Sequence, residues 1–114
     1  MPSQAWKAEE RAVARLIGGQ RYPANTGGLV DCESPWVVTQ CKHVQRMSLA
    51  ELERLAIEGE REGARRGKVG LVVVKRRAGR GFHTPRLFIM TAGTWTHVVG
   101  QMEPTAINYS KGDG

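Results

Sequence analysis

The run from residue 70 to residue 75, Gly-Leu-Val-Val-Val-Lys, places the strongest constraint on the fold of this chain. It is almost continuously apolar and rich in β-branched side chains, which favour strands. A strand with one solvated face would alternate apolar and polar residues, and this run does not. It therefore predicts a strand that is covered on both faces.

Two segments have the pattern of helices that pack against such a strand. Residues 5–17 carry apolar side chains at near-helical spacing, and Gly18-Gly19 supplies a stop. Residues 48–51, Ser-Leu-Ala-Glu, match a capping box, in which Ser and Glu satisfy each other's exposed backbone donors at a helix start. A second helix is expected from there to about Arg66, ended by Gly67.

The other segments read as strands and turns. Residues 23–28 are rich in turn formers, residues 76–86 form a basic loop that contains glycine, and residues 95–99 suit either a short helix or a strand. Further strands are expected at residues 20–22, 29–31, 36–42 and 87–91. The order α, β, β, β, α, β, β predicts an α/β fold in which helices flank a mixed central sheet.

Length and charge narrow the class of protein. The chain has 114 residues, which predicts one domain, expected in residues 1–100, with a weakly ordered tail in residues 101–114. Seventeen Lys and Arg residues against eleven Asp and Glu residues give a formal net charge of +6. Such a charge favours polyanionic partners, nucleic acid first and anionic membranes second.

The sequence also argues against a membrane protein. No apolar run approaches the roughly 18 residues that a spanning helix needs, and the N-terminus lacks the apolar core of a signal peptide. We therefore expect a cytoplasmic protein with no membrane partner. Cys32 and Cys41 can in principle pair across adjacent strands, but without secretion both are expected to stay reduced.

The most informative motif lies between Asp31 and Lys42. Asp31 is expected at the end of one short strand, and Gln40 and Lys42 in the next strand across a turn that contains Pro35. Because successive side chains of a strand alternate between its faces, Gln40 and Lys42 share one face, about 6 to 7 Å apart along the backbone. Such a face suits a metal ion beside a cation.

These residues resemble the signature of a known family. Asp31, followed nine positions later by Gln40-Cys41-Lys42, looks like the D…(D/E/Q)-x-K motif of the PD-(D/E)xK nucleases, whose core is also α-β-β-β-α-β. Glu10-Arg11 resembles the start of archaeal-type and phage Holliday junction resolvases. Residues 25–28, Asn-Thr-Gly-Gly, occupy the place of the Ser-Gly loop of those enzymes. The resemblance spans about residues 6–90.

The resemblance implies a PD-(D/E)xK nuclease core and a hydrolase that resolves four-way (Holliday) junctions by paired symmetric nicks during DNA recombination. The catalytic ion would be Mg²⁺, with Mn²⁺ possible, because hard divalent cations take oxygen ligands. Lys42 would orient or help to deprotonate the attacking water, or stabilise the phosphorane. The implied metal ligands are Glu10, Asp31, the side-chain oxygen of Gln40 and the backbone carbonyl of Cys41.

Several assignments have alternatives. Helical geometry does not choose between Glu9 and Glu10, and the family register favours Glu10. Glu33 is read as a turn residue and a spare carboxylate. Zinc is disfavoured because alternation places Cys41 and His43 on the face opposite Lys42, and no fourth ligand has recognisable spacing.

Gln40 departs from the pattern of most family members, which have Glu or Asp at this position. A neutral amide removes a charge and weakens divalent binding, although its oxygen still coordinates. Two alternatives therefore stay open. One is a nuclease of the same fold that acts on other branched, flap or nicked DNA, and the other is a non-catalytic basic DNA-binding module.

Basic residues indicate how DNA is held, through phosphates and without base reading. The Thr26 hydroxyl is as readily a loop group as a contact to phosphate or metal-bound water. The cations expected on DNA are Arg11, Arg15, Arg65, Arg66, Lys68, Lys75, Arg76, Arg77, Arg80 and Arg86.

A four-way junction has approximate two-fold symmetry and must be nicked at two equivalent strands. A chain with one site is therefore expected to act as a homodimer. Residues 87–90 and the region of Trp95 are candidates for the interface. The small size of the chain resembles phage-encoded members of the family, which implies the host cytoplasm as the location in that case.

Overall fold

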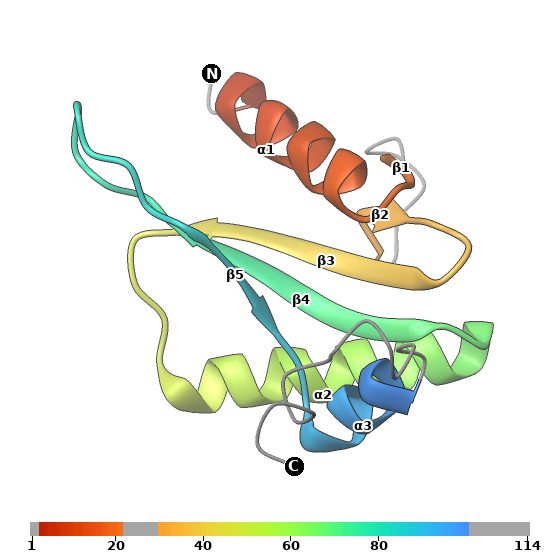
Figure 1. The fold of residues 1–114 in the computed structure, drawn as a ribbon. Helices are drawn as coiled ribbons and strands as arrows, with labels where there is room; N and C mark the ends of the chain where they lie inside the picture. The colour runs from red at the N-terminus through yellow and green to blue at the C-terminus, as the bar shows by residue number, and fades with distance from the viewer. Residues whose placement is uncertain (1–2, 22–29, 101–114) are drawn as a thin grey trace, which may run out of the picture.

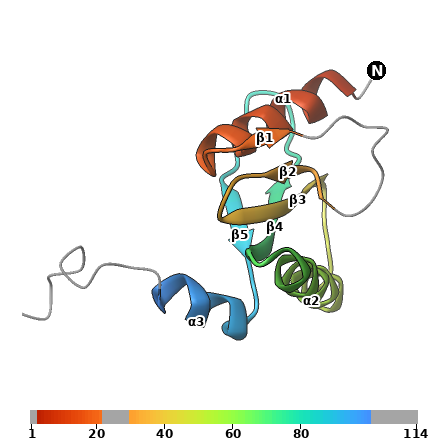
Figure 2. The same ribbon diagram turned by 90° about the vertical axis from the view of Figure 1, so that its right-hand side faces the viewer.

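A computed structural model describes residues 3–21 and 30–100 of the protein, and within them it has a mixed α/β fold. Helix α1 covers one face of a five-stranded sheet, and helices α2 and α3 lie on the side of the other face (Figures 1 and 2). The elements are α1 (Ser3–Leu16), β1 (Gln20–Arg21), β2 (Cys32–Glu33), β3 (Val37–Val44), α2 (Leu49–Arg66), β4 (Val69–Arg76), β5 (Arg86–Ile89) and α3 (Ala92–Gly100). This order confirms the predicted α/β architecture.

The sheet has the order β1-β2-β3-β4-β5. Strands β3 and β4 are parallel, and the other neighbours are antiparallel. Parallel neighbours need a long connection, which α2 provides. Strand β4 is buried from Gly70 to Val74, as the apolar run predicts.

The core consists of two clusters, one on each side of the sheet. Val13 of α1 packs with Cys41 and Val73 in the first cluster. Leu55 of α2 packs with Val72 and Val74 in the second. Successive residues of β4 therefore enter opposite clusters, which is why its sequence is apolar without alternation.

Helix α2 begins and ends where the sequence predicts. The Ser48 hydroxyl accepts the backbone N–H of Glu51 at 3.1 Å, and Gly67 ends the helix with a φ of 68°. A left-handed residue at this position favours glycine because glycine has no Cβ. The Glu51 carboxylate pairs with Arg54, in place of the return bond to the Ser48 amide that a full capping box has.

The structure corrects the predicted strand before the turn. Its pairing in this region begins at Cys32, so Asp31 precedes β2 and does not end it. The Asp31 side chain accepts the amide hydrogen of Cys41, which the backbone of a continuing strand would otherwise bind. Residues 22–29, and with them Thr26 and all of the predicted turn-rich loop, lie outside the described residues.

At the C-terminal end, the segment that suited helix or strand is helical. Thr91 caps α3, since its hydroxyl accepts the backbone N–H of Thr94 at 3.0 Å and donates to the Glu60 carboxylate of α2 at 2.8 Å. The predicted tail, residues 101–114, lies outside the described residues. Over the described part of the chain, no helix combines the length and apolarity needed to cross a membrane.

Candidate functional site

Asp31 lies where β2 and β3 begin to pair. Its backbone N–H donates to the Thr39 carbonyl at 2.8 Å, and its Oδ2 accepts the Cys41 N–H at 2.7 Å. Burial raises the pKa of Asp31 above its ordinary value, against the opposing effects of the Cys41 hydrogen bond and the charges of Lys42 and Arg21. The carboxylate is thus held beside β3, within electrostatic reach of Lys42.

Glu10 reaches toward the same place from α1. Its side chain is 2% exposed, and its Oε1 accepts Arg21 Nε at 2.7 Å. Its Oε2 is buried and has no hydrogen-bond partner among residues 3–21 and 30–100. Burial raises the pKa of Glu10, and the charge of Asp31 raises it further, while the Arg21 bond and charge and the Lys7 charge lower it. The two carboxylates therefore lie close enough to repel each other.

This pair of carboxylates has the properties of a cation site. Burial penalises the ionised forms of both groups, the charge of Asp31 further penalises ionised Glu10, and a bound cation would relieve both effects. Glu10 Oε2 is a buried oxygen that no described residue contacts by a hydrogen bond, as an unused ligand would be. Among the described residues, no group of three or more His, Cys, Asp or Glu is arranged to hold a metal ion. A cation that keeps several waters, as Mg²⁺ does, needs only one or two carboxylates, so the donors fit such an ion.

Gln40 lies apart from Glu10. Cys41 packs in the core cluster beneath α1, so its neighbours Gln40 and Lys42 face the side of α2. Gln40 lines a small cavity with Glu58 and Glu62 of α2. The structure therefore places Asp31 within electrostatic reach of both Glu10 and Lys42, but Gln40 and Lys42 both lie on the side of the sheet opposite α1 and Glu10.

The neighbouring carboxylate, Glu9, has a different partner. Its two oxygens accept Nε and Nη2 of Arg86 at 2.7 and 3.0 Å. Arg86 begins β5 at one edge of the sheet, whereas Arg21, the partner of Glu10, lies in β1 at the other edge. Helix α1 is therefore tied to both edges, and Glu10 is the residue beside Asp31.

Arg21 is the site residue that sequence reasoning missed. Its Nε binds Glu10, and its charge also lowers the pKa of Asp31. Its positive charge offsets part of the negative charge of Glu10 and Asp31. Nothing in the sequence distinguishes Arg21 from other surface cations, because its partners come from α1 and from the residue just before β2.

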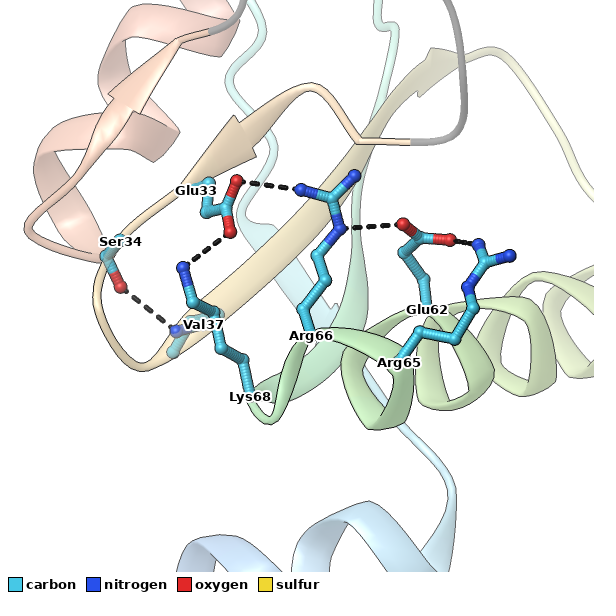
Figure 3. Close-up of polar contacts among 7 residues, drawn as sticks. All are labelled: Glu33, Ser34, Val37, Glu62, Arg65, Arg66 and Lys68. Carbon is cyan, nitrogen blue, oxygen red and sulfur yellow. Dashed lines mark hydrogen bonds and ion pairs between the residues drawn. The ribbon is translucent and has the colours of Figure 1, made fainter.

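Three of the cations expected on DNA belong to an ion-pair network at the end of α2 (Figure 3). Arg66 binds Glu33 at 2.9 Å and Glu62 at 2.7 Å, Lys68 binds Glu33, and Arg65 binds Glu62. The network joins β2 to the end of α2, beside the turn that the Ser34 hydroxyl closes by accepting the Val37 N–H (Figure 3). Glu33, read from the sequence as a turn residue and spare carboxylate, is thus a strand residue that holds two cations.

The other expected DNA-binding cations divide into two groups. Arg86 pairs with Glu9, and Lys75 Nζ donates to the carbonyl and hydroxyl oxygens of Thr84 at 2.6 and 3.1 Å. The second group is exposed and has no ion pair within residues 3–21 and 30–100. It consists of Arg11, Arg15, Arg76, Arg77 and Arg80.

Comparison of the chain with protein-family models, curated proteins and solved structures gives no match. Its function is therefore inferred from its own residues and their geometry.

Proposed function

We propose that the protein is a metal-dependent DNA endonuclease of the PD-(D/E)xK type that resolves four-way junctions by paired symmetric nicks. One observation carries the proposal. Asp31 is fixed by the Cys41 amide within electrostatic reach of both Glu10 of α1 and Lys42 of β3. Asp31 and Lys42 are the charged residues of the family motif, and Glu10 corresponds to the helix carboxylate of the resolvases that the chain resembles. Glu10 lies in α1, Asp31 just before β2 and Lys42 in β3.

Phosphodiester hydrolysis needs charge neutralisation at the phosphate, a deprotonated water and a cation near the developing charge. A bound Mg²⁺ or Mn²⁺ would polarise the phosphate and acidify its water. Asp31 and Glu10 would hold the ion, with the carbonyl oxygen of Cys41 as a further donor. Gln40 and Lys42 both face the α2 side of the sheet, so either would reach an ion held by Glu10 only by turning its side chain toward Asp31.

Lys42 supplies the cation of the site. As an ammonium close to Asp31, its Nζ can orient the attacking water, accept its proton after losing its own, or stabilise the charge on the phosphorane. Arg21 donates its Nε–H to Glu10 Oε1 and so holds this carboxylate in place.

The deciding experiment compares a synthetic four-way junction with a linear duplex of equal sequence, in Mg²⁺, in Mn²⁺ and in chelator. We expect two symmetric nicks on opposing strands of the junction, dependent on metal. Lys42→Ala should slow cleavage by about 100-fold or more, which is the usual contribution of a general acid or base. Arg61→Ala removes an exposed cation of α2 and serves as the matched control, with an expected change of less than about twofold.

The proposal is overturned if purified protein binds DNA but cuts nothing in either metal. That result would favour a non-catalytic basic DNA-binding module, for which the neutral Gln40 and its position on the α2 side are the specific support. Equal cleavage of flaps, nicked duplex and junctions would instead favour a nuclease of the same fold with another branched substrate.

The proposal carries two further expectations. Paired nicks on a two-fold symmetric substrate call for a homodimer, since the chain carries one site. Exposed apolar side chains on β5 and α3, at Leu87, Phe88 and Trp95, offer a surface for it. The corresponding location is the cytoplasm, that of the host if the chain is phage-encoded.

A further inference from the structure

Arg76, the last residue of β4, and residues 77–85, which join β4 to β5, form a projecting hairpin that we call the β4–β5 arm. It extends beyond the body of the sheet on the side of the N-terminal end of α1 (Figure 1). An extended hairpin of this kind adds nothing to the two core clusters. Its shape is therefore explained better by a partner than by the stability of the domain.

The base of the β4–β5 arm is braced by hydrogen bonds. Arg77 N–H donates to the Val44 carbonyl at 2.7 Å, which continues the pairing of β3 and β4. Lys75 Nζ and the Thr84 carbonyl, 2.6 Å apart, join the two sides of the arm, and the Thr84 hydroxyl donates to the Arg76 carbonyl at 2.5 Å. The ion pair between α1 and the first residue of β5 holds the returning strand. The arm is thus positioned without a bound partner.

Its charge is uncompensated. Arg76, Arg77 and Arg80 are exposed and have no ion pair among the described residues. The sequence contains no Asp or Glu between Glu62 and Glu103, so no acidic side chain lies near them along the chain. Three unpaired guanidinium groups on one arm attract a polyanion, and phosphates along one DNA strand follow each other at about 3.4 Å.

The tip also carries an aromatic ring. Phe82 is 75% exposed, and its N–H donates to the Gly79 carbonyl at 3.1 Å, which fixes the turn. Single exposed apolar residues are common on proteins, but this one stands among unpaired arginines. Aromatic rings beside a basic track are what single-stranded nucleic acid binds, because bases stack on them. Paired bases are already stacked within the duplex and offer no free face.

The arm lies close to the candidate site. In the parallel register of β3 and β4, Lys42 is opposite Val74 and Val44 is opposite Arg76. The arm therefore begins about 7 Å beyond Lys42 along the strands. A DNA strand held at Asp31 and Lys42 can continue directly onto the arm.

We propose that the β4–β5 arm binds unpaired nucleotides of branched DNA. The Phe82 ring stacks on an unpaired base, while Arg76, Arg77 and Arg80 contact the flanking phosphates. The substrate class of the site is thus DNA with accessible unpaired bases next to a duplex. The proposal rests on the proposed function for the choice of DNA as the polymer.

The test measures binding by fluorescence anisotropy in chelator, so that cleavage plays no part. The probes are a duplex with a short single-stranded gap and a fully paired duplex of the same length. Phe82→Ala should weaken binding to the gapped DNA about tenfold, since stacking of one base is lost, and Phe82→Trp should restore it. Binding to the paired duplex should change less than about twofold.

Two controls define the roles within the arm. Leu49→Ala removes another highly exposed apolar side chain, at the start of α2, and should leave both affinities unchanged. A variant with Arg77→Gln and Arg80→Gln should bind both DNAs more weakly, and its affinity should depend less on salt, because two phosphate contacts are lost.

An equal effect of Phe82→Ala on gapped and paired DNA, or no effect on either, overturns the proposal. So does tighter binding to phosphatidylserine vesicles than to either DNA with the same dependence on Phe82, which would mark the arm as a membrane contact. The outcome is separable from the nuclease proposal. If the protein cleaves no DNA but its binding to gapped DNA still depends on Phe82, the nuclease proposal fails and the proposal for the arm stands.

Discussion

At the scale of the residue, Asp31 and Glu10 differ from ordinary surface carboxylates. Both are buried enough that their pKa values rise above the ordinary 3.8 and 4.5. The folded protein then binds more protons than the unfolded chain at a pH between the ordinary and the raised pKa values. The stability that this provides is fully present below the ordinary pKa and is lost as the pH rises through the folded pKa.

We therefore expect Asp31→Asn to gain stability relative to the wild type as the pH rises from about 4 to about 7. The amide oxygen can still accept the Cys41 N–H, so the substitution removes the charge and keeps the bond. Urea unfolding of both proteins across this range measures the effect. Parallel curves for the two proteins would show that Asp31 titrates as it does in the unfolded chain.

Glu51→Gln is the control of opposite sign. Its hydrogen bond to Arg54 lowers the pKa of Glu51 on the exposed surface of α2. Its contribution to stability is present above the ordinary pKa and is lost as the pH falls through the folded pKa. The variant should therefore lose stability relative to the wild type as the pH rises.

At the scale of the element, the ion pair of Glu9 and Arg86 attaches α1 to the edge strand β5. Glu9 is 6% exposed and Arg86 is 33% exposed, so removal of the arginine leaves a buried carboxylate without its partner. Arg86→Met should lower the free energy of unfolding by about 2 to 3 kcal/mol, somewhat less than for a fully buried pair because solvent reaches the arginine. Chemical denaturation measures this loss.

The double variant Glu9→Leu with Arg86→Met should recover most of that stability, because no unpaired charge then remains. Arg54→Ala, which breaks exposed ion pairs of α2, should cost less than about 1 kcal/mol. If Arg86→Met left stability unchanged and weakened DNA binding, Arg86 would be a phosphate contact after all.

Helix α2 and strand β4 approach each other at glycines. A Cβ on Gly70 would lie 1.8 Å from the Gly59 carbonyl oxygen, and one on Gly63 would lie 2.5 Å from the Gly70 nitrogen. Real Cβ atoms do not approach backbone so closely, so the helix would have to move. The contact between these glycines sets the distance between α2 and β4, the strand that pairs with Gln40 and Lys42 of β3.

Gly70→Ala should accordingly lower the free energy of unfolding by about 3 kcal/mol, the upper range for overpacking of a core. Thermal and urea unfolding would report it. Gly79→Ala in the β4–β5 arm is the control, because its Cβ would meet only the Phe82 ring, at 3.8 Å. A Gly70→Ala protein as stable as the control would mean that α2 can shift without cost.

At the scale of the whole molecule, apolar side chains remain exposed along one edge. Leu87 is 49% exposed, Phe88 41% and Trp95 52%. Strand β5 is the last strand of the described sheet, so its outer side has no strand partner there. An edge strand with exposed apolar side chains is a surface on which another chain can pair.

We expect a homodimer in solution that Phe88→Glu weakens by about 30-fold or more, as the loss of a central apolar contact does. Sedimentation equilibrium over a range of protein concentrations measures the dissociation constant. Leu49→Glu places the same charge at an exposed apolar position of α2 and should leave the dimer intact. If the wild-type protein stays monomeric at every concentration, the predicted homodimer is wrong. A homodimer would then no longer explain how the protein makes paired nicks.

The sequence by itself determined the order of the elements up to β5, the central strand, the boundaries of α2 and the shared face of Gln40 and Lys42. These features depend on local rules of periodicity, capping and alternation, which act over a few residues. It also selected Asp31 and Lys42 as candidates. The predicted strand that ends at Asp31 was wrong, because the Asp31 side chain, and not a backbone carbonyl, accepts the Cys41 N–H.

Only the tertiary structure decided which charges are paired and which are free. Glu33 meets Arg66 and Lys68 across 33 and 35 residues, and Glu9 meets Arg86 across 77 residues. Such ion pairs depend on which elements pack together, and a short stretch of sequence does not show this. For the same reason, tertiary packing placed Arg21 beside Glu10 and Gln40 on the α2 side, and it gave the arginines of the β4–β5 arm no ion pair within the described part of the chain.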